Sequence, residues 1–167
     1  ARGGGGESES NHSKPCGFMF SGVAYSGLEI VSLADDDAEA IEYLQQHLRI
    51  VDPLYGWLRP MDAIEPYRLE MATKNMFSNS NDVDDPKLKL EEFWKPTIGS
   101  CLKMEEEKDG SDVVIVNLAS DEYSCAVDNG DRIVKIVFRH GGRTIGIHAK
   151  RARGLMVRYM AENCVST

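Results

Sequence analysis

Apolar residues recur at helical spacing early in the chain. The pattern predicts a helix over about 34–51, whose apolar stripe consists of Ile41, Leu44, Leu48 and Val51. Ser32 and Asp35 resemble a capping box at its start, and Pro53 is expected to end it because the residue before a proline avoids helical geometry. A second, short helix is expected between Pro60 and Pro66, since proline is well tolerated at a first helical position.

Two further helices are expected in the second half of the chain. The stretch LKLEEFWKPTIGSCLKMEEE predicts a helix with a break near Pro96, because proline lacks the backbone N–H that a helix interior requires. The last helix is predicted over about 149–163. Its apolar face is expected to consist of Ala152, Leu155, Met156, Tyr159 and Met160.

Short β-branched runs predict strands, and these are concentrated late in the chain. VVIVNLA (113–119) is continuously apolar, which is typical of a strand buried on both faces. IVKIVF (133–138) and TIGIHA (144–149) flank Gly141 and Gly142, and this arrangement favours a hairpin. The fold class that follows is α+β, with a mixed sheet and surrounding helices.

The ends and the cysteines set the context of the fold. Residues 1–15 are rich in Gly, Ser and charge, so we expect a disordered segment followed by a single domain over 16–167. No run approaches the roughly 20 apolar residues of a membrane span, and the N-terminus has no apolar core of a secretory signal. Four scattered cysteines without a CxxC pair suggest small buried side chains in a reducing, cytosolic setting.

Charge is distributed unevenly along the chain. Residues 132–167 contain eight lysines and arginines and one acidic residue, Glu162, which gives a net charge of +7. Because the whole chain has a net charge of −8, the other 131 residues have a net charge of −15. A positive block in an acidic protein would attract polyanions. The same block also fits a solvated helix face and a patch that balances the acidic half.

Several long strings carry a family resemblance. HLRIVDPLYGWLRPMDAIEPYRLEMATK (47–74), LEEFWKPTI (90–98), NLASDEY (117–123) and HAKRARGLMVRYM (148–160) are similar, in this order, to blocks of the YaaA family of peroxide-stress proteins. FSGVAYSGL (20–28) fits the loop that precedes them. Members of the family open with a strand and a Ser-Pro-Ala-Lys motif where this chain has ARGGGGESESNHSKPCG, so we expect an N-terminally truncated YaaA-like fold with uncovered apolar surface.

The resemblance implies a cytosolic protein that helps cells survive hydroperoxide. It implies binding to duplex DNA through a positive cleft and a helix-hairpin-helix-like element, and limitation of free intracellular iron. The corresponding turn is 52–56, where Gly56 supplies backbone freedom and Arg59 would lie beside a phosphate. Pro53 removes one N–H from this turn, and an ordinary turn between two helices is the competing interpretation.

Two basic groups complete the candidate DNA-binding residues. Arg68 and Lys74 flank Glu70 and could line a cleft, although Arg68 could equally pair with a neighbouring acid. The second group lies at the start of the last helix, where cations oppose the helix dipole unless an anion binds there. It consists of Lys150, Arg151, Arg153 and Arg158, and Gly154 among them suggests close packing of another element.

The loop NLASDEY supports a different hypothesis. Asp121 and Glu122 could hold a metal or act as acid and base, which would make the protein a metal-dependent enzyme or an iron-handling protein. Solvated carboxylates and helix capping by Ser120 are the structural alternatives. No GxxxxGK[ST], HExxH or GxSxG string occurs, so the leading hypothesis has no catalytic residues, no cofactor and no metal.

Overall fold

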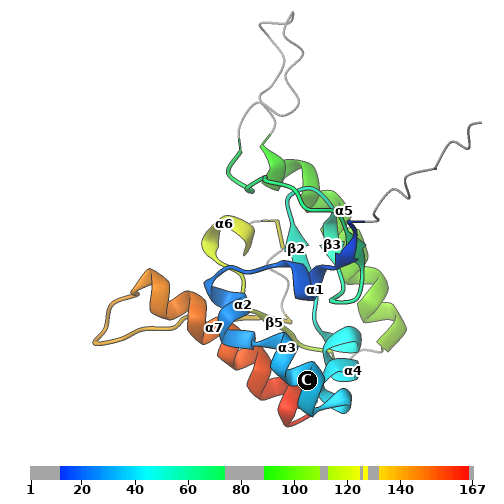
Figure 1. Cartoon of the computed structure of the whole chain (residues 1–167). Helices are drawn as coiled ribbons and strands as arrows, with labels where there is room; N and C mark the ends of the chain where they lie inside the picture. The colour runs from blue at the N-terminus through cyan, green and yellow to red at the C-terminus, as the bar shows by residue number, and fades with distance from the viewer. Residues whose placement is uncertain (1–11, 74–88, 110–112, 125, 128–131, 166–167) are drawn as a thin grey trace, which may run out of the picture.

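The computed structural model describes residues 12–73, 89–109, 113–124, 126–127 and 132–165 (Figure 1). The elements of the first part are β1 (Lys14–Pro15), α1 (Cys16–Met19), α2 (Val23–Leu28), α3 (Ile30–Asp36), α4 (Ala38–His47), β2 (Ile50–Asp52), β3 (Gly56–Leu58) and β4 (Ala63–Ile64). The later elements are α5 (Leu90–Asp109), β5 (Ile115–Asn117), α6 (Asp121–Ser124), β6 (Ile133–Lys135) and α7 (Gly146–Glu162).

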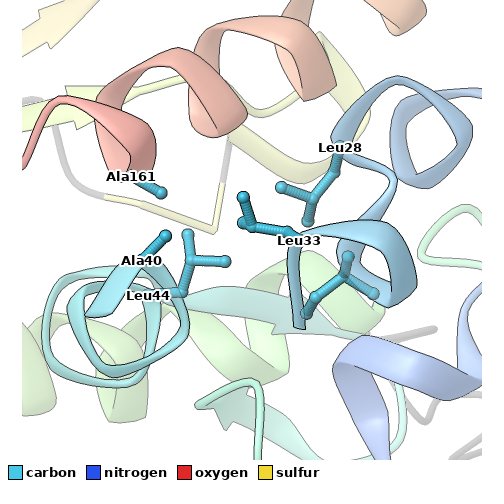
Figure 2. Packing of buried hydrophobic residues seen from close by; sticks show 6 residues of the cluster. Leu28, Leu33, Ala40, Leu44 and Ala161 are labelled. Carbon is cyan, nitrogen blue, oxygen red and sulfur yellow. The ribbon is translucent and has the colours of Figure 1, made fainter. Parts of the chain in front are cut away.

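Four helices enclose the first part of the core. The turn after α2 and the helices α3 and α4 pack against the last turns of α7, and their buried side chains meet in one cluster (Figure 2). Leu33 and Leu44 are each 1% exposed, so truncating either to alanine would cost roughly 2–5 kcal/mol. Ala161 contributes a small side chain from α7, which lets the helices approach closely.

The predicted helix over 34–51 is wrong at both ends. Asp37 has extended backbone angles and separates α3 from α4, and its side chain accepts a hydrogen bond from the Ala40 N–H at 3.0 Å. Asp37 is therefore the N-cap of α4, in place of the expected capping box at Ser32. The helix ends at His47, because Leu48 is extended and residues 50–52 pair as a strand.

The strands form three separate pairs in the part of the chain that the structure describes, where one mixed sheet was expected. β1 pairs antiparallel with β4, β2 pairs antiparallel with β3, and β5 pairs parallel with β6. The predicted helix between Pro60 and Pro66 is also wrong, since this stretch is a turn followed by β4. β5 is shorter than predicted, and its first two residues are only half-buried.

The helix predicted around Pro96 is present as α5, but the break predicted near Pro96 is wrong. Pro96 lies inside it without dividing it, although proline cannot donate to the carbonyl of Glu92. Ile98 and Leu102 are buried by residues of the β2–β3 hairpin and by Val127. This packing fixes α5 against the hairpin and forms a second part of the core, beside a third around Cys16 and Ile64.

The last helix is confirmed, but its buried face differs from the prediction. Its buried residues are Ala149, Gly154 and Ala161, whereas Leu155 and Tyr159 are 48% and 58% exposed. Small residues are buried because α7 packs directly against the backbone of α2. The Gly141-Gly142 turn is present, with a single bridge between His140 and Arg143, but no strand forms over 144–149 because α7 already begins at Gly146.

The last residues of the segment 1–15, which was expected to be disordered, belong to the fold. Lys14 and Pro15 pair with Ile64 and Ala63, so they belong to the fold, while residues 1–11 lie outside the described residues. Of the helices placed here, none combines the length and the apolar character needed to span a bilayer.

Candidate functional site

A cavity of about 870 Å³ is lined by residues of α2, the β2–β3 hairpin, β5 and α7. Its walls combine the apolar residues that lead into and form β5, from Val113 to Val116, with hydroxyl and charged side chains from several segments. This volume lies within the range of small-molecule and cofactor sites, roughly 300–1,000 Å³. The polar wall residues considered below are Tyr25, Asp52, Tyr67, Arg68, Tyr123, Lys150 and Arg153.

One face of α7 forms a long side of the cavity. Lys150, Arg153, Gly154, Val157 and Met160 all line it, and their spacing of three or four residues places them on one helix face. Ten residues of α-helix span about 15 Å, so the cavity extends along several turns. The basic side chains therefore lie toward the N-terminal end of α7, and the apolar ones lie toward its C-terminal end.

Asp52 is the most deeply buried charged residue of the cavity wall, at 1% exposure. Its Oδ1 accepts hydrogen bonds from the backbone N–H groups of Leu54 and Tyr55, both at 2.8 Å, and its Oδ2 accepts a short hydrogen bond from the Tyr67 hydroxyl. These donors replace the water that a carboxylate loses on burial. They also fix the hairpin turn and hold the Tyr67 ring at the cavity.

Three tyrosines line the same region and remain neutral. Burial is the main cause that raises the pKa of Tyr25, Tyr67 and Tyr123 above the ordinary value of 10.0. The Asp52 carboxylate raises all three further, and for Tyr67 its hydrogen bond adds to the effect. A neutral phenol both donates and accepts hydrogen bonds, so this wall offers uncharged polar contacts to a guest.

Cys16 lies behind this wall and is not a reactive thiol. Burial raises its pKa from 9.0 to about 11, and Asp62 adds to the shift. Its Sγ donates to the carbonyls of Arg59 and Pro60 at 3.0 and 3.6 Å. The expected role of small buried side chain is thus confirmed for Cys16, whereas Cys164 is exposed.

Three of the predicted DNA-binding residues line this cavity. Arg68 comes from the segment after β4, and Lys150 and Arg153 come from the first turns of α7. No ion pair joins any of the three to a carboxylate within the described ranges. The Nε atom of Arg153 is buried without a hydrogen-bond partner. Arg151 is exposed on the neighbouring face of α7, and its carbonyl lies against Gly27.

Arg158 is engaged inside the fold. Its Nη1 donates to the carbonyls of Leu28 and Glu29, each at 3.3 Å, and to Ser32 Oγ at 3.1 Å. Its Nε pairs with Glu162 at 2.7 Å, one helical turn away. These contacts tie α7 to the end of α2 and the start of α3, which gives Arg158 a structural role independent of any ligand.

The expected helix-hairpin-helix at 52–56 is a β-hairpin. Gly56 has φ +78° and faces Trp94, so a Cβ there would lie 2.3 Å from the indole ring. Glycine is required here for two reasons: it leaves room for the indole ring, and it adopts this φ without strain. Arg59 is not among the lining residues of the cavity, and its Nη2 lies 3.7 Å from the carboxylate of Glu105, which does line it. Lys74 lies outside the described residues.

The carboxylates of NLASDEY already have protein partners. Asp121 forms an ion pair with Lys135 at 2.7 Å, and this lysine, with a smaller contribution from Arg153, lowers the pKa of Asp121. Glu122 accepts a hydrogen bond from the Ala72 N–H at 3.0 Å. Across the residues placed by the structure, no group of three or more His, Cys, Asp or Glu side chains could hold a metal ion.

Sequence reasoning missed the hydroxyl and carboxylate part of this wall. Tyr67 and Asp52 are 15 residues apart and meet only because the chain turns back after β4. Trp57, which also lines the cavity, has a buried indole N–H without a partner. The only local sign was the presence of polar residues within otherwise apolar stretches.

Comparison with known proteins identifies a matching family and several related proteins. The family described as Peroxide stress protein YaaA matches residues 6–167. A UPF0246 protein of Bordetella avium is 44% identical over 156 residues, which cover 89% of this chain and 56% of the relative. A UPF0246 protein of Francisella tularensis subsp. holarctica is 41% identical over 162 residues, 93% of this chain and 59% of the relative.

A UPF0246 protein of a Psychrobacter species is 37% identical over 166 residues, 93% of this chain and 58% of the relative. The chain thus spans somewhat more than half the length of these curated relatives. The family match covers nearly the whole chain and includes every block on which the resemblance was based. The chain therefore belongs to the family of the peroxide stress protein YaaA.

Proposed function

We propose that this protein acts in the cytosol during peroxide stress as a non-enzymatic DNA-binding protein. The observation that carries the proposal is that Arg68, Lys150 and Arg153 line one cavity, although more than 80 residues separate Arg68 from the other two in sequence. Cations without carboxylate partners are suited to phosphates, which supply most of the affinity in sequence-independent DNA binding. Membership in a peroxide-stress family supports the physiological setting.

The charge distribution favours contact at the start of α7. Lys150 and Arg151 are both exposed there, where a cation opposes the helix dipole by a few tenths of a kcal/mol. A DNA phosphate at this end would offset that cost. Because the net charge of the chain is −8, the affinity has to come from this local basic surface. Contacts restricted to phosphates give weak sequence preference.

Charge reversal at exposed positions tests the proposal. Lys150→Glu with Arg151→Glu should weaken binding to unrelated duplexes equally, and the magnitude of the salt-dependence slope should fall by about 0.9 per lost phosphate contact. Fluorescence anisotropy at several salt concentrations measures both quantities. Lys103→Glu with Lys108→Glu on α5 is the matched control, because both lysines are exposed and the charge change is identical. Equal loss in both double variants would indicate a general charge effect and contradict the proposed site.

We also propose that limitation of free intracellular iron is the physiological outcome. In cells that lack the protein, peroxide should raise free iron measured by whole-cell electron paramagnetic resonance, and the wild-type protein should restore the lower level. The Lys150→Glu, Arg151→Glu variant should fail to restore it if DNA binding is the cause. Purified protein that contains stoichiometric iron and has no affinity for DNA would favour the metal-dependent alternative at Asp121 and Glu122 instead.

A further inference from the structure

Two buried hydrogen-bond donors of the cavity wall lack partners. They are Arg153 Nε from α7 and Trp57 Nε1 from the β2–β3 hairpin, and both residues line the cavity. Native structures rarely leave such donors unsatisfied, because each buried donor without an acceptor is destabilising. Both nitrogen atoms are shielded from solvent, so an acceptor in the cavity reaches them only if the two side chains turn toward the guest. Two residues of the cavity wall thus carry donors that the described residues do not satisfy.

The cavity wall combines two kinds of chemistry. Arg68, Lys150 and Arg153 line it and form no ion pair with a carboxylate among the residues described, although Arg153 contributes to the lowered pKa of Asp121. A phosphate monoester carries close to two negative charges and three acceptor oxygens, whereas a carboxylate carries one charge and two oxygens. A cluster of three cations is thus better matched by a phosphate. Arg68 and Lys150 are exposed, so the phosphate would lie at the mouth.

Other parts of the wall are apolar, with uncharged polar groups beside them. Val116 and Val157 provide apolar contacts, and the hydroxyl groups of Tyr25 and Tyr123 provide donors and acceptors. This combination suits a flat heterocycle, whose faces are apolar and whose edges carry ring nitrogens and carbonyls. The indole N–H of Trp57 would be satisfied by one such acceptor.

We propose that the cavity binds one nucleotide unit, with its phosphate at Arg68, Lys150 and Arg153 and its base against the tyrosine and tryptophan wall. The unit could be a free nucleoside monophosphate or an unpaired nucleotide of a DNA strand, since both present the same chemistry. For the second source this inference rests on the proposed function. It would make an extruded or terminal nucleotide the structural feature of DNA that the protein prefers.

The first experiment uses free ligands with the whole chain. Deoxyadenosine monophosphate, deoxyadenosine, inorganic phosphate and decanoate are titrated while the tryptophan fluorescence and the heat of binding are recorded. The monophosphate should bind at least about tenfold more tightly than deoxyadenosine or phosphate, as expected for one or more charge-assisted hydrogen bonds. Equal affinity for deoxyadenosine, or tighter binding of decanoate, would overturn the proposal, as would the absence of monophosphate binding.

Two variants separate the phosphate and base contacts. Arg68→Gln should lower the affinity for the monophosphate to that for deoxyadenosine, and Arg143→Gln is its control because Arg143 is exposed and outside the cavity wall. Trp57→Phe keeps an aromatic ring and removes the buried donor, so it should weaken binding of the monophosphate and of deoxyadenosine by the same factor. A folded Trp57→Phe protein with unchanged affinity for both would contradict the placement of the base.

The second experiment distinguishes the sources. A duplex with one unpaired nucleotide should bind more tightly than the matched duplex, and the free monophosphate should remove this difference by competition. If matched duplex binds but neither preference nor competition is observed, the nucleotide site is refuted and the proposed function stands. If the monophosphate binds and no duplex does, the proposed function fails and the site for a free nucleotide stands.

Discussion

Gly154 of α7 lies so close to Ala24 of α2 that a Cβ atom on the glycine would be 1.8 Å from the Ala24 carbonyl oxygen. The contact is mutual, because a Cβ atom on Gly27 would be 2.4 Å from the carbonyl oxygen of Arg151. Gly27 and Gly154 thus let the backbones of α2 and α7 pack in direct contact. The same approach positions the Lys150 and Arg153 face of α7 along the cavity.

Gly154→Ala should therefore strongly destabilise the protein. The added methyl group meets backbone atoms, which cannot move without separating the two helices, and overpacking of this kind costs about 3 kcal/mol or more. Gly99→Ala on α5 is the matched control, because a Cβ there meets nothing within 4 Å. The control should be neutral or gain up to about 1 kcal/mol from helix propensity. Urea unfolding of both variants measures the difference, and similar midpoints would contradict the close contact.

Helices were predicted best where their signals were local and long. The helix around Pro96 and the last helix are both present, and close packing at Gly154 is confirmed. The stripe from Ile41 to Val51 predicted too long a helix, because β2 continues the apolar pattern after His47. Strands of two or three residues give no usable alternation, so the three pairs could not be predicted.

The candidate site was predicted only in part, for a physical reason. The charges of Arg68, Lys150 and Arg153 are visible in sequence, but their presence on one cavity wall depends on tertiary packing, which includes the α2–α7 contact for the two residues of α7. Arg158 has the same charge as Lys150 and Arg153 and lies on the same helix, yet its guanidinium is directed to α2 and α3. Residue type and spacing do not distinguish these two outcomes. The hydrogen bond between Asp52 and Tyr67 likewise depends on tertiary structure.

Cysteine reactivity should follow burial. At pH 8 the raised pKa of Cys16, about 11 instead of 9.0, leaves its thiolate fraction about a hundredfold lower than that of an unperturbed thiol. Iodoacetamide labelling followed by peptide mass spectrometry should therefore modify the exposed Cys164 well before Cys16. In denaturant the two should react at similar rates. Early labelling of Cys16 in the folded protein would show that its thiol is accessible.

Stability should decrease in alkaline solution because of the tyrosines. The folded-state pKa of Tyr25 and of Tyr67 is raised above 10.0, so each phenol retains its proton in the folded chain while the unfolded chain ionises. The unfolded state then binds fewer protons, and the free energy of unfolding falls as the pH rises above about 10. Below that pH these groups contribute no slope. Urea unfolding between pH 7 and 11 measures the profile.

The Tyr67→Phe variant tests how the Tyr67 hydroxyl group contributes to stability at neutral and at alkaline pH. It removes the hydrogen bond to Asp52 and leaves a buried carboxylate with one donor fewer, which should cost roughly 1–3 kcal/mol at pH 7. The variant should also lose part of the alkaline decrease, because one of the two raised groups is absent. Tyr159→Phe is the control, since Tyr159 is 58% exposed. A Tyr67→Phe protein with wild-type stability at pH 7 would contradict the role of this hydrogen bond.

Arg158 and Arg151 should separate stability from DNA binding. Arg158→Met retains much of the aliphatic side chain but removes every hydrogen bond to Leu28, Glu29 and Ser32, and it leaves two helix-end carbonyls without this donor. Because hydrogen bonds from charged groups contribute about 1.5–3 kcal/mol and the side chain is only 19% exposed, a loss of about 2 kcal/mol is expected. Arg151→Met should leave the free energy of unfolding within about 0.5 kcal/mol, because Arg151 is exposed.

The binding measurements should show the reverse order. Arg151→Met should reduce the magnitude of the salt-dependence slope for duplex DNA by about 0.9, the value for one phosphate contact. Arg158→Met, measured below its unfolding temperature, should leave that slope unchanged, because its guanidinium is already held by α2, α3 and Glu162. A smaller slope for Arg158→Met with wild-type stability would instead make Arg158 a DNA contact. A loss of stability without a change in slope would show that Arg158 acts through its contacts to α2 and α3. A change in slope without a loss of stability would show that it contacts a phosphate.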